Sequence, residues 1–126
     1  MKPQPKILVV DDTEVHRTTI VHALKEEGFY DVVEARDGKE ALELHDKHNP
    51  DIMLLDLVMP RVDGPGVLAE LRKQAAKVKV IVITEVNDIF MEENVRNLFK
   101  NVMEYITKPF QEVRVIEAVR AVAVTL

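Results

Sequence analysis

Cysteine is absent from the sequence. A disulfide framework, a zinc site built on thiolates and a thiol nucleophile are therefore excluded. Because a chain without cysteine suits a reducing compartment, we expect a cytoplasmic protein. Apolar runs long enough for a membrane-spanning helix, which needs about 20 residues, are also absent, so we expect no membrane partner.

Clusters of Lys and Arg are missing as well. Acidic residues outnumber basic residues by 22 to 17, and the net charge is −5. Because a chain of this charge repels a polyanion such as DNA, we expect no direct contact with nucleic acid. The amino terminus reads MKPQPK and lacks the apolar segment of a secretory signal, so we expect residues 1–5 to form a disordered lead-in.

What the sequence does contain is the composition of one compact domain. It has 126 residues, of which 47% are apolar and 31% are charged, enough to bury a core and to cover it with charge. No linker, low-complexity tract or internal repeat divides the chain. We therefore expect residues 1–126 to form a single domain.

Short apolar runs alternate with longer amphipathic stretches. Runs of four or five residues rich in Val, Ile and Leu, without polar alternation, are typical of strands buried on both faces. Three stretches, residues 13–27, 65–75 and 111–124, repeat apolar residues at the spacing of three and four that predicts helices. The apolar runs lie at residues 7–10, 31–35, 52–55, 80–83 and 105–106.

Turn residues separate these segments. Gly28 follows the first helix, Asp37-Gly38 can begin the second, and Pro50 precedes the third strand. Five strand-then-helix units result. Such alternation predicts an α/β fold, with a parallel sheet covered by helices on both faces and joined by right-handed crossovers.

Polar side chains follow the strands at the points where they end. Asp11 and Asp12 come directly after the first strand, and Asp56 comes directly after the third. Thr84 and Lys108 stand at the ends of the fourth and fifth. Because the carboxyl ends of parallel strands line one edge of the sheet, where open α/β sheets hold ligands, we expect these five side chains to converge.

Each of these residues has an ordinary interpretation on its own. A lone Asp after a strand is often a helix cap, and Lys-Pro is often only a turn. The coincidence at four strand ends favours a shared site. Two carboxylates about 5 Å apart repel by about 3 kcal/mol at an effective dielectric of about 20, so three of them need a cation. Oxygen ligands with room for water favour Mg²⁺ or Mn²⁺ over zinc.

A divalent ion beside an ammonium and a hydroxyl suits chemistry on a phosphoryl group. The ion and Lys108 neutralise charge on the transferring oxygens, and a carboxylate can be the nucleophile that forms an aspartyl phosphate. Asp56 is the candidate nucleophile, because its strand would lie centrally in the sheet, between the acidic pair and Thr84.

The chain resembles the receiver domains of response regulators over residues 5–124. The resemblance implies the chemotaxis-type fold, which is flavodoxin-like: a doubly wound (βα)5 sandwich of three layers around a five-stranded parallel sheet in the order 2-1-3-4-5. It also implies a phosphorelay function in a two-component system. Five segments in this order carry it, namely ILVVDDTEVHR, EARDGKEAL, PDIMLLDLVMPRVDG, VIVIT and YITKPF.

The resemblance further implies a role for each residue of the site. Asp56 accepts a phosphoryl group from the phosphohistidine of a sensor histidine kinase or a phosphotransfer protein. Asp11 and Asp12 hold Mg²⁺ or Mn²⁺ together with Asp56 and the backbone carbonyl of Val58. Lys108 pairs first with Asp56 and then with the phosphoryl oxygens.

A second group of residues is implied to transmit the signal. Thr84 donates its hydroxyl to the phosphoryl group, and Tyr105 turns between exposed and inward rotamers. Pro109 is expected to follow a cis peptide bond. Residues 89–124 are expected to bind an output partner or domain, with the protein a monomer or a phosphorylation-dependent dimer. Such a protein is not an enzyme, beyond promoting its own phosphorylation and slow dephosphorylation.

Four positions depart from the family pattern. Glu85 follows Thr84 where the family usually has Ala or Gly, and its bulk and charge are expected to slow phosphorylation by small donors. Val58 and Val86, both expected to rim the site, cannot hydrogen-bond a water that attacks the phosphoryl group, which predicts a long-lived phosphorylated state. Asn101 precedes the last strand where the family often has Gly-Ala, and it can take the left-handed, helix-ending conformation that Gly takes more easily.

The histidines are interpreted as residues without a role in the site. His45 and His48 lie three apart on the second helix, and without an acidic or thiol partner at matching spacing they belong to a solvated helix face. His16 and His22 are interpreted as surface or partly buried side chains.

Two other functions stay open. A Mg²⁺-dependent phosphatase with an aspartyl-phosphate intermediate needs an acid two residues after the nucleophile, where this chain has Val58. A degenerate receiver would bind partners without being phosphorylated; the complete set of site residues opposes it, and only Glu85 favours it. The sequence names no kinase, stimulus or output pathway, and its length fits both a stand-alone regulator and one domain of a longer protein.

Overall fold

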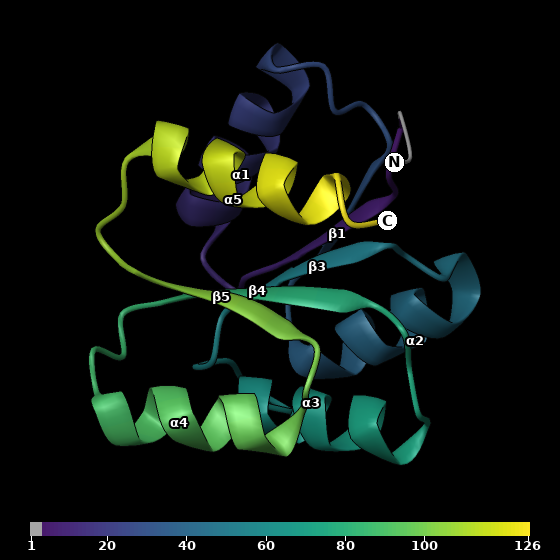
Figure 1. Ribbon diagram of the computed structural model, residues 1–126, viewed down its shortest axis with the longest axis vertical. Coiled ribbons are helices and arrows are strands. Elements are labelled where there is room, and N and C mark those ends of the chain that lie inside the picture. Colours follow the sequence, from purple (N-terminus) through teal and green to yellow (C-terminus); the bar gives the residue numbers. More distant parts are fainter. Residues whose placement is uncertain (1–3) are drawn as a thin grey trace.

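Five strands alternate with five helices along residues 4–126, the part of the chain that the computed structural model describes. Figure 1 shows the sheet between two layers of helices. The strands are β1 Ile7–Val10, β2 Val32–Ala35, β3 Ile52–Leu55, β4 Lys79–Thr84 and β5 Val102–Thr107. The helices are α1 Glu14–Glu26, α2 Gly38–His48, α3 Gly64–Lys73, α4 Ile89–Leu98 and α5 Glu112–Ala123.

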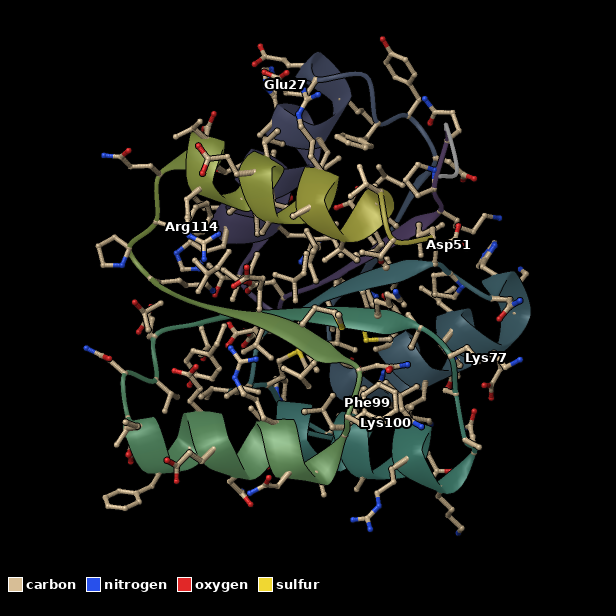
Figure 2. All side chains as sticks on the ribbon, in the orientation of Figure 1. Glu27, Asp51, Lys77, Phe99, Lys100 and Arg114 are labelled. Atoms are coloured by element: carbon tan, nitrogen blue, oxygen red, sulfur yellow. The ribbon has the colours of Figure 1, made fainter. Side chains whose placement is uncertain are left out.

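All five strands are parallel and form one sheet in the order β2-β1-β3-β4-β5. Helices α1 and α5 cover one face, and α2, α3 and α4 cover the other (Figure 1). The predicted sheet order and the three-layer α/β architecture are therefore confirmed. Figure 2 shows Glu27 on the α1 side of the sheet and Lys77 and Lys100 on the opposite side.

The core is divided in two by the sheet, because successive side chains of a strand point to opposite faces. In β1, Ile7 and Val9 pack toward α1 and α5, whereas Leu8 and Val10 pack toward α2 and α3. The central strands β3 and β4 alternate in the same way, and β1 and β3 are buried at every residue. This two-sided burial explains why these strands read as unbroken apolar runs.

The two edge strands are less apolar, and this limited the prediction for β5. The structure extends this strand over six residues, whereas the sequence indicated only residues 105–106. Of the six, only Val102 and Ile106 are buried, because β5 pairs with β4 alone and keeps part of its surface in contact with solvent. A strand with this pattern has no continuous apolar run to reveal its length.

Asn101, which we considered for the left-handed conformation after α4, does not adopt it. Asn101 is not among the described residues with positive φ; its side-chain amide donates to the carbonyl of Lys77 at 3.4 Å. The left-handed conformation occurs after two other helices, at Asn49 after α2 with φ 48° and at Ala75 after α3 with φ 53°. Asparagine takes this conformation more easily than most residues, so the physical argument was sound but was applied to the wrong helix.

The lead-in expected to be disordered falls partly outside the described residues, since residues 1–3 are not described. Gln4 donates from its side chain to the carbonyl of Gly28 at 2.7 Å, and Pro5 is buried. Among the described residues, no helix is long and apolar enough to cross a membrane.

Candidate functional site

Three carboxylates meet at the carboxyl edge of the sheet. Asp11 and Asp12 follow β1, and Asp56 follows β3, which is paired with β1 so that Val10 lies beside Leu55. One oxygen from each carboxylate lies within 4.8 Å of the other two. Asp11 and Asp56 are buried, with 1% and 7% of their surface exposed, whereas Asp12 is exposed. The convergence expected from the strand ends is therefore present for these three residues.

The loop that carries Asp11 is fixed by hydrogen bonds on both sides. Its Oδ1 accepts from the backbone amide of Thr13 at 2.8 Å. The buried guanidinium of Arg17 donates to the Asp11 backbone carbonyl at 2.8 Å and to Glu34 of β2 at 3.1 Å. Arg17 thus joins the first turn of α1 to two neighbouring strands and holds Asp11 in place.

The Lys108 ammonium lies between two of the carboxylates. Its Nζ donates to Asp11 Oδ2 at 2.6 Å and to Asp56 Oδ2 at 2.9 Å. The backbone amide of Lys108 bonds to the carbonyl of Thr84, and the bond to Pro109 is cis, as the family resemblance implies. Burial alone would lower the pKa of Lys108, but its hydrogen bonds to Asp11 and Asp56 outweigh burial and raise it.

Thr84 and Tyr105 both bind the backbone of Val86. Thr84 is fully buried at the end of β4, and its hydroxyl oxygen accepts from the Val86 amide at 3.4 Å. Tyr105 of β5 is half-buried and donates from its hydroxyl to the Val86 carbonyl at 2.6 Å. Burial, and then the negative charges of Glu92, Asp88 and Asp56, raise the pKa of Tyr105 and keep it a donor.

A cavity of about 240 Å³ opens beside these residues. Of the two positions expected to rim the site, Val58 lines this cavity and Val86 does not; Glu85 also lines it, and both Val58 and Glu85 are exposed. Val86 contributes the backbone contacts to Thr84 and Tyr105 instead. The lining consists of Asp12, Thr13, His16, Asp56, Val58, Glu85 and Lys108.

His16 is a site residue that the sequence analysis missed. Its Nδ1 lies 2.9 Å from Lys108 Nζ and 3.9 Å from Asp11 Oδ2. The available signal was its place in the first turn of the helix that follows the acidic pair, four residues after Asp12. That turn begins at the carboxyl edge of the sheet, so its side chains can reach the strand ends.

The interpretation of His45 as solvated is also wrong, because only 8% of its surface is exposed. It lies on the buried face of α2, and its Nδ1 is 3.2 Å from Asp46 Oδ1. His22 is exposed on α1, and its Nε2 lies 3.5 Å from Glu26 Oε1. Of these histidines, only His16 lies at the carboxylates.

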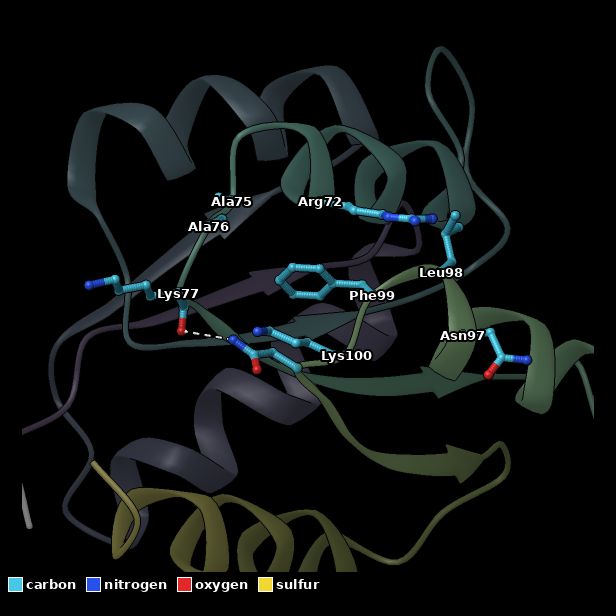
Figure 3. A pocket seen from close by; sticks show the side chains of 9 residues that line it. Arg72, Ala75, Ala76, Lys77, Asn97, Leu98, Phe99 and Lys100 are labelled. Atoms are coloured by element: carbon cyan, nitrogen blue, oxygen red, sulfur yellow. Dashed lines mark hydrogen bonds between the residues drawn. The ribbon is translucent and has the colours of Figure 1, made fainter.

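A larger hollow of about 650 Å³ lies elsewhere, beyond the carboxyl ends of α3 and α4 (Figure 3). No carboxylate lines it, so it offers none of the ligands of the acidic site. Arg72 stands in the last turn of α3, where a positive charge offsets the partial negative charge of the helix end. Its lining is Arg72, Ala75, Ala76, Lys77, Asn97, Leu98, Phe99, Lys100 and Asn101.

Comparison with known proteins identifies the family of the chain. The family model described as "Response regulator receiver domain" matches residues 7–120, nearly the whole chain. The chain belongs to the response regulator receiver family. It is the receiver domain of a two-component response regulator, and the resemblance drawn from the sequence motifs is confirmed.

Curated relatives of this receiver domain are of two lengths. The chemotaxis protein CheY of Listeria monocytogenes is 37% identical over 94% of this chain and 98% of its own. The probable transcriptional regulator ycf27 of Porphyridium aerugineum is 38% identical over 93% of this chain but 47% of its own. The chain thus spans nearly all of the first relative and about half of the second.

Solved receiver domains have the same fold. The signal receiver domain of the putative response regulator NarL from Mycobacterium tuberculosis matches with a TM-score of 0.87 and 29% identity, over 97% of this chain and 98% of that one. The receiver domain of the Francisella response regulator 1452 matches with a TM-score of 0.87 and 31% identity, over 98% and 100%. Both likenesses agree with the flavodoxin-like sheet order.

The acidic cluster of this receiver domain fits a hard divalent cation. Its three carboxylates offer oxygen ligands only, and the adjoining cavity leaves room for coordinated water. Few protein oxygens with retained water are the ligand set of Mg²⁺, and Mn²⁺ accepts the same donors. Because Lys108 already binds oxygens of Asp11 and Asp56, an incoming cation competes with the ammonium for part of this set.

The ion pairs of Lys108 predict a loss of stability at alkaline pH. Because the pKa of Lys108 is raised by folding, its contribution to the free energy of unfolding is complete below the unfolded value near 10.5 and is lost as pH rises through the folded pKa. Urea unfolding at a series of alkaline pH values should show that the free energy of unfolding falls more steeply with pH in the wild type than in Lys108→Met. Parallel losses in the two proteins would contradict this.

Removal of one carboxylate should separate metal binding from charge repulsion. In EDTA, Asp12→Asn relieves repulsion within the cluster and should raise the free energy of unfolding by about 1 kcal/mol. In excess MgCl₂ the wild type should gain more stability than the variant, because the variant has lost a ligand. The exposed Asp31 lies outside the cluster, so Asp31→Asn is the matched control. If Asp31→Asn and Asp12→Asn gained the same stability from MgCl₂, Asp12 would not be a ligand of the metal.

Proposed function

We propose that Asp56 accepts a phosphoryl group from a phosphohistidine of a sensor histidine kinase or a phosphotransfer protein, in a Mg²⁺-dependent reaction. The observation that carries this proposal is the position of Asp56. Its Oδ2 lies 2.9 Å from the Lys108 ammonium, within the cluster of three carboxylates and at the wall of an open cavity. A phosphodonor can reach the carboxylate from solvent while the groups that stabilise the reaction are already in place.

In the transfer, a carboxylate oxygen of Asp56 forms a bond to phosphorus as the phosphorus–nitrogen bond of the donor breaks. The donor imidazole leaves with the electron pair, and an acyl phosphate remains on Asp56. The Lys108 ammonium, freed from the Asp56 oxygen, binds a phosphoryl oxygen. A divalent ion held by Asp11, Asp12, Asp56 and the Val58 carbonyl would neutralise further charge on the phosphoryl oxygens.

The contacts of Val86 suggest how phosphorylation changes the distal surface. An added phosphoryl group offers new acceptors, and the Thr84 hydroxyl satisfies one of them by leaving the Val86 amide. The loop that follows β4 then moves, and the Val86 carbonyl no longer holds the Tyr105 hydroxyl. Tyr105 is thereby free to change rotamer. Differential contacts of this kind typically shift an equilibrium by about 1–3 kcal/mol.

The proposed readout surface, residues 89–124, exposes apolar side chains. Ile89 and Phe90 at the start of α4 are 69% and 77% exposed, and Val113 of α5 is 57% exposed. Large apolar side chains that remain exposed favour contact with another protein. We propose that an output protein, an attached output domain or a second copy of the chain binds here in the phosphorylated state.

The phosphatase alternative lacks a necessary group. Val58 occupies the position two residues after Asp56, lines the cavity and carries no proton to exchange. We therefore propose a signalling module and not an enzyme with an external substrate. Glu85, which also lines the cavity, is the feature that favours a receiver of reduced reactivity.

Phosphorylation of Asp56 is directly testable. With acetyl phosphate and MgCl₂, intact-mass spectrometry should show one added phosphoryl group on the wild type and none on Asp56→Asn. With beryllofluoride and MgCl₂, heteronuclear NMR should show shifts that extend from Asp56 to Tyr105. An unmodified wild type with no shifts would favour a degenerate receiver, and steady hydrolysis of a phosphate ester would favour the phosphatase.

The absence of a polar side chain at Val58 predicts a long-lived phosphorylated state. Val58→Asn places an amide at the cavity, where it can orient an attacking water, and should speed loss of the phosphoryl group several-fold. The decay is measured by intact mass after the donor is removed. Val113→Asn, on the distant α5, is the matched control, and equal decay rates in all three proteins would refute the role of Val58.

The Glu85 carboxylate should slow the approach of small anionic donors. Glu85→Ala removes a negative charge from the cavity lining and is expected to raise the rate of phosphorylation by acetyl phosphate, most clearly at low ionic strength. The exposed Glu43 lies on α2 outside the cavity, so Glu43→Ala is a control of equal charge. The same rate in both variants would show that Glu85 is turned to solvent without effect.

A further inference from the structure

The Lys108 ammonium has three partners in the structure, and the third is a histidine. Besides Asp11 Oδ2 at 2.6 Å and Asp56 Oδ2 at 2.9 Å, its Nζ lies 2.9 Å from Nδ1 of His16. Only 5% of the Lys108 side chain is exposed, so its three N–H bonds depend on protein acceptors. Asp11 and Asp56 accept two of these bonds, and His16 supplies the acceptor for the third.

This contact defines which ring nitrogen of His16 carries the proton. An ammonium can only donate, so Nδ1 accepts with its lone pair and the proton of the neutral imidazole lies on Nε2. His16 also lines a second cavity of about 210 Å³, next to the one at Asp56, and Lys108 lines both. The two side chains therefore form part of the wall between these cavities.

The partners of Lys108 differ in what the proposed reaction does to them. Asp11 and Asp56 are the carboxylates that a divalent ion would bind, and Asp56 also becomes the acyl phosphate. His16 is neither a proposed metal ligand nor the phosphoryl acceptor, so its lone pair stays available throughout. It is the one partner of the three that can hold the ammonium in the same place before and after transfer.

We propose that His16 is a positioning residue, which holds the Lys108 ammonium at Asp56 while the metal and the phosphoryl group take over the carboxylate oxygens. This role rests on the proposed phosphorylation of Asp56. His16 reaches Lys108 from the first turn of α1, whose backbone is fixed by the bond from Arg17 N to Thr13 O and by the buried Arg17 guanidinium. The acceptor is therefore set on a rigid element, as positioning requires.

The hydrogen bond can be tested in the protein without metal or donor. Nitrogen-15 NMR of the histidine rings, at a pH where they are neutral, should show His16 in the single tautomer with Nε2 protonated. In Lys108→Met the same ring should become a mixture of both tautomers. A mixture in the wild type already overturns the proposal, and this result does not depend on the folding of any variant.

The positioning role is tested with a pair of variants of nearly equal shape. His16→Asn keeps an acceptor close to the position of Nδ1, whereas His16→Leu fills similar space without one. Loss of one hydrogen bond of about 1 kcal/mol corresponds to about a fivefold change, so His16→Leu should bind beryllofluoride with Mg²⁺ about fivefold more weakly than the wild type. His16→Asn should recover most of this loss, and His22→Leu, on the exposed face of the same helix, should show none.

The outcomes separate the two proposals. If the wild type forms no beryllofluoride or phosphoryl adduct at Asp56, the proposed function fails, and with it the role of His16. If the wild type forms the adduct and His16→Leu binds as tightly as His16→Asn, the positioning role alone is overturned. A purely structural role would weaken both His16 variants equally and would leave the tautomer unchanged in Lys108→Met.

Discussion

The charge balance around the Lys108 ammonium is the constraint on which the site depends. Asp11 and Asp56 are both buried, and both lie within hydrogen-bond distance of its Nζ. Two carboxylates this near repel by about 3 kcal/mol at an effective dielectric of about 20, and the ammonium offsets that repulsion. Asp11 and Lys108 are 97 positions apart in the chain, so this balance exists only once β1, β3 and β5 share one sheet.

The same balance prepares the site for a change of ligands. In the proposed reaction, the metal would bind oxygens of Asp11 and Asp56 and the phosphoryl group would bond to Asp56, so each would displace the Lys108 ammonium from a carboxylate oxygen that it now binds. The backbone around the site is fixed independently, since Arg17 joins α1 to β1 and β2 through the Asp11 carbonyl and Glu34. The ligands can therefore be exchanged while the strand ends keep their places.

In the proposed switch, the site and the distal surface are connected through Val86. Its amide donates to the hydroxyl oxygen of Thr84, the residue proposed to bind the phosphoryl group. Its carbonyl accepts from the hydroxyl of Tyr105, which belongs to the proposed readout surface. One peptide segment is thus shared by two hydroxyl groups on neighbouring strands. In the proposed switch, a small movement at Thr84 would change the partner of Tyr105, without any rearrangement of the central strands.

The fold was predictable because its central strands are buried on both faces. β1 and β3 consist entirely of buried apolar residues, and such runs are visible in the sequence with their correct bounds. Edge strand β5 could not be bounded, because alternate contact with solvent removes the apolar run. The left-handed position was assigned to Asn101 and found at Asn49, because the sequence shows which residues tolerate that conformation but not where a helix ends in this way.

For the site, the sequence by itself determined the acidic residues and the lysine, because polar residues after buried parallel strands must lie at one edge of the sheet. Only the tertiary structure decided which of the other side chains join them. His16 reaches Lys108 and His45 packs into the core, although both are histidines on helices next to polar residues. His16 stands in the first turn of α1, at the carboxyl edge of the sheet, whereas His45 stands in the last turn of α2, on its buried face. Which face of a helix is buried is set by its packing against the sheet, and helical spacing alone leaves it free.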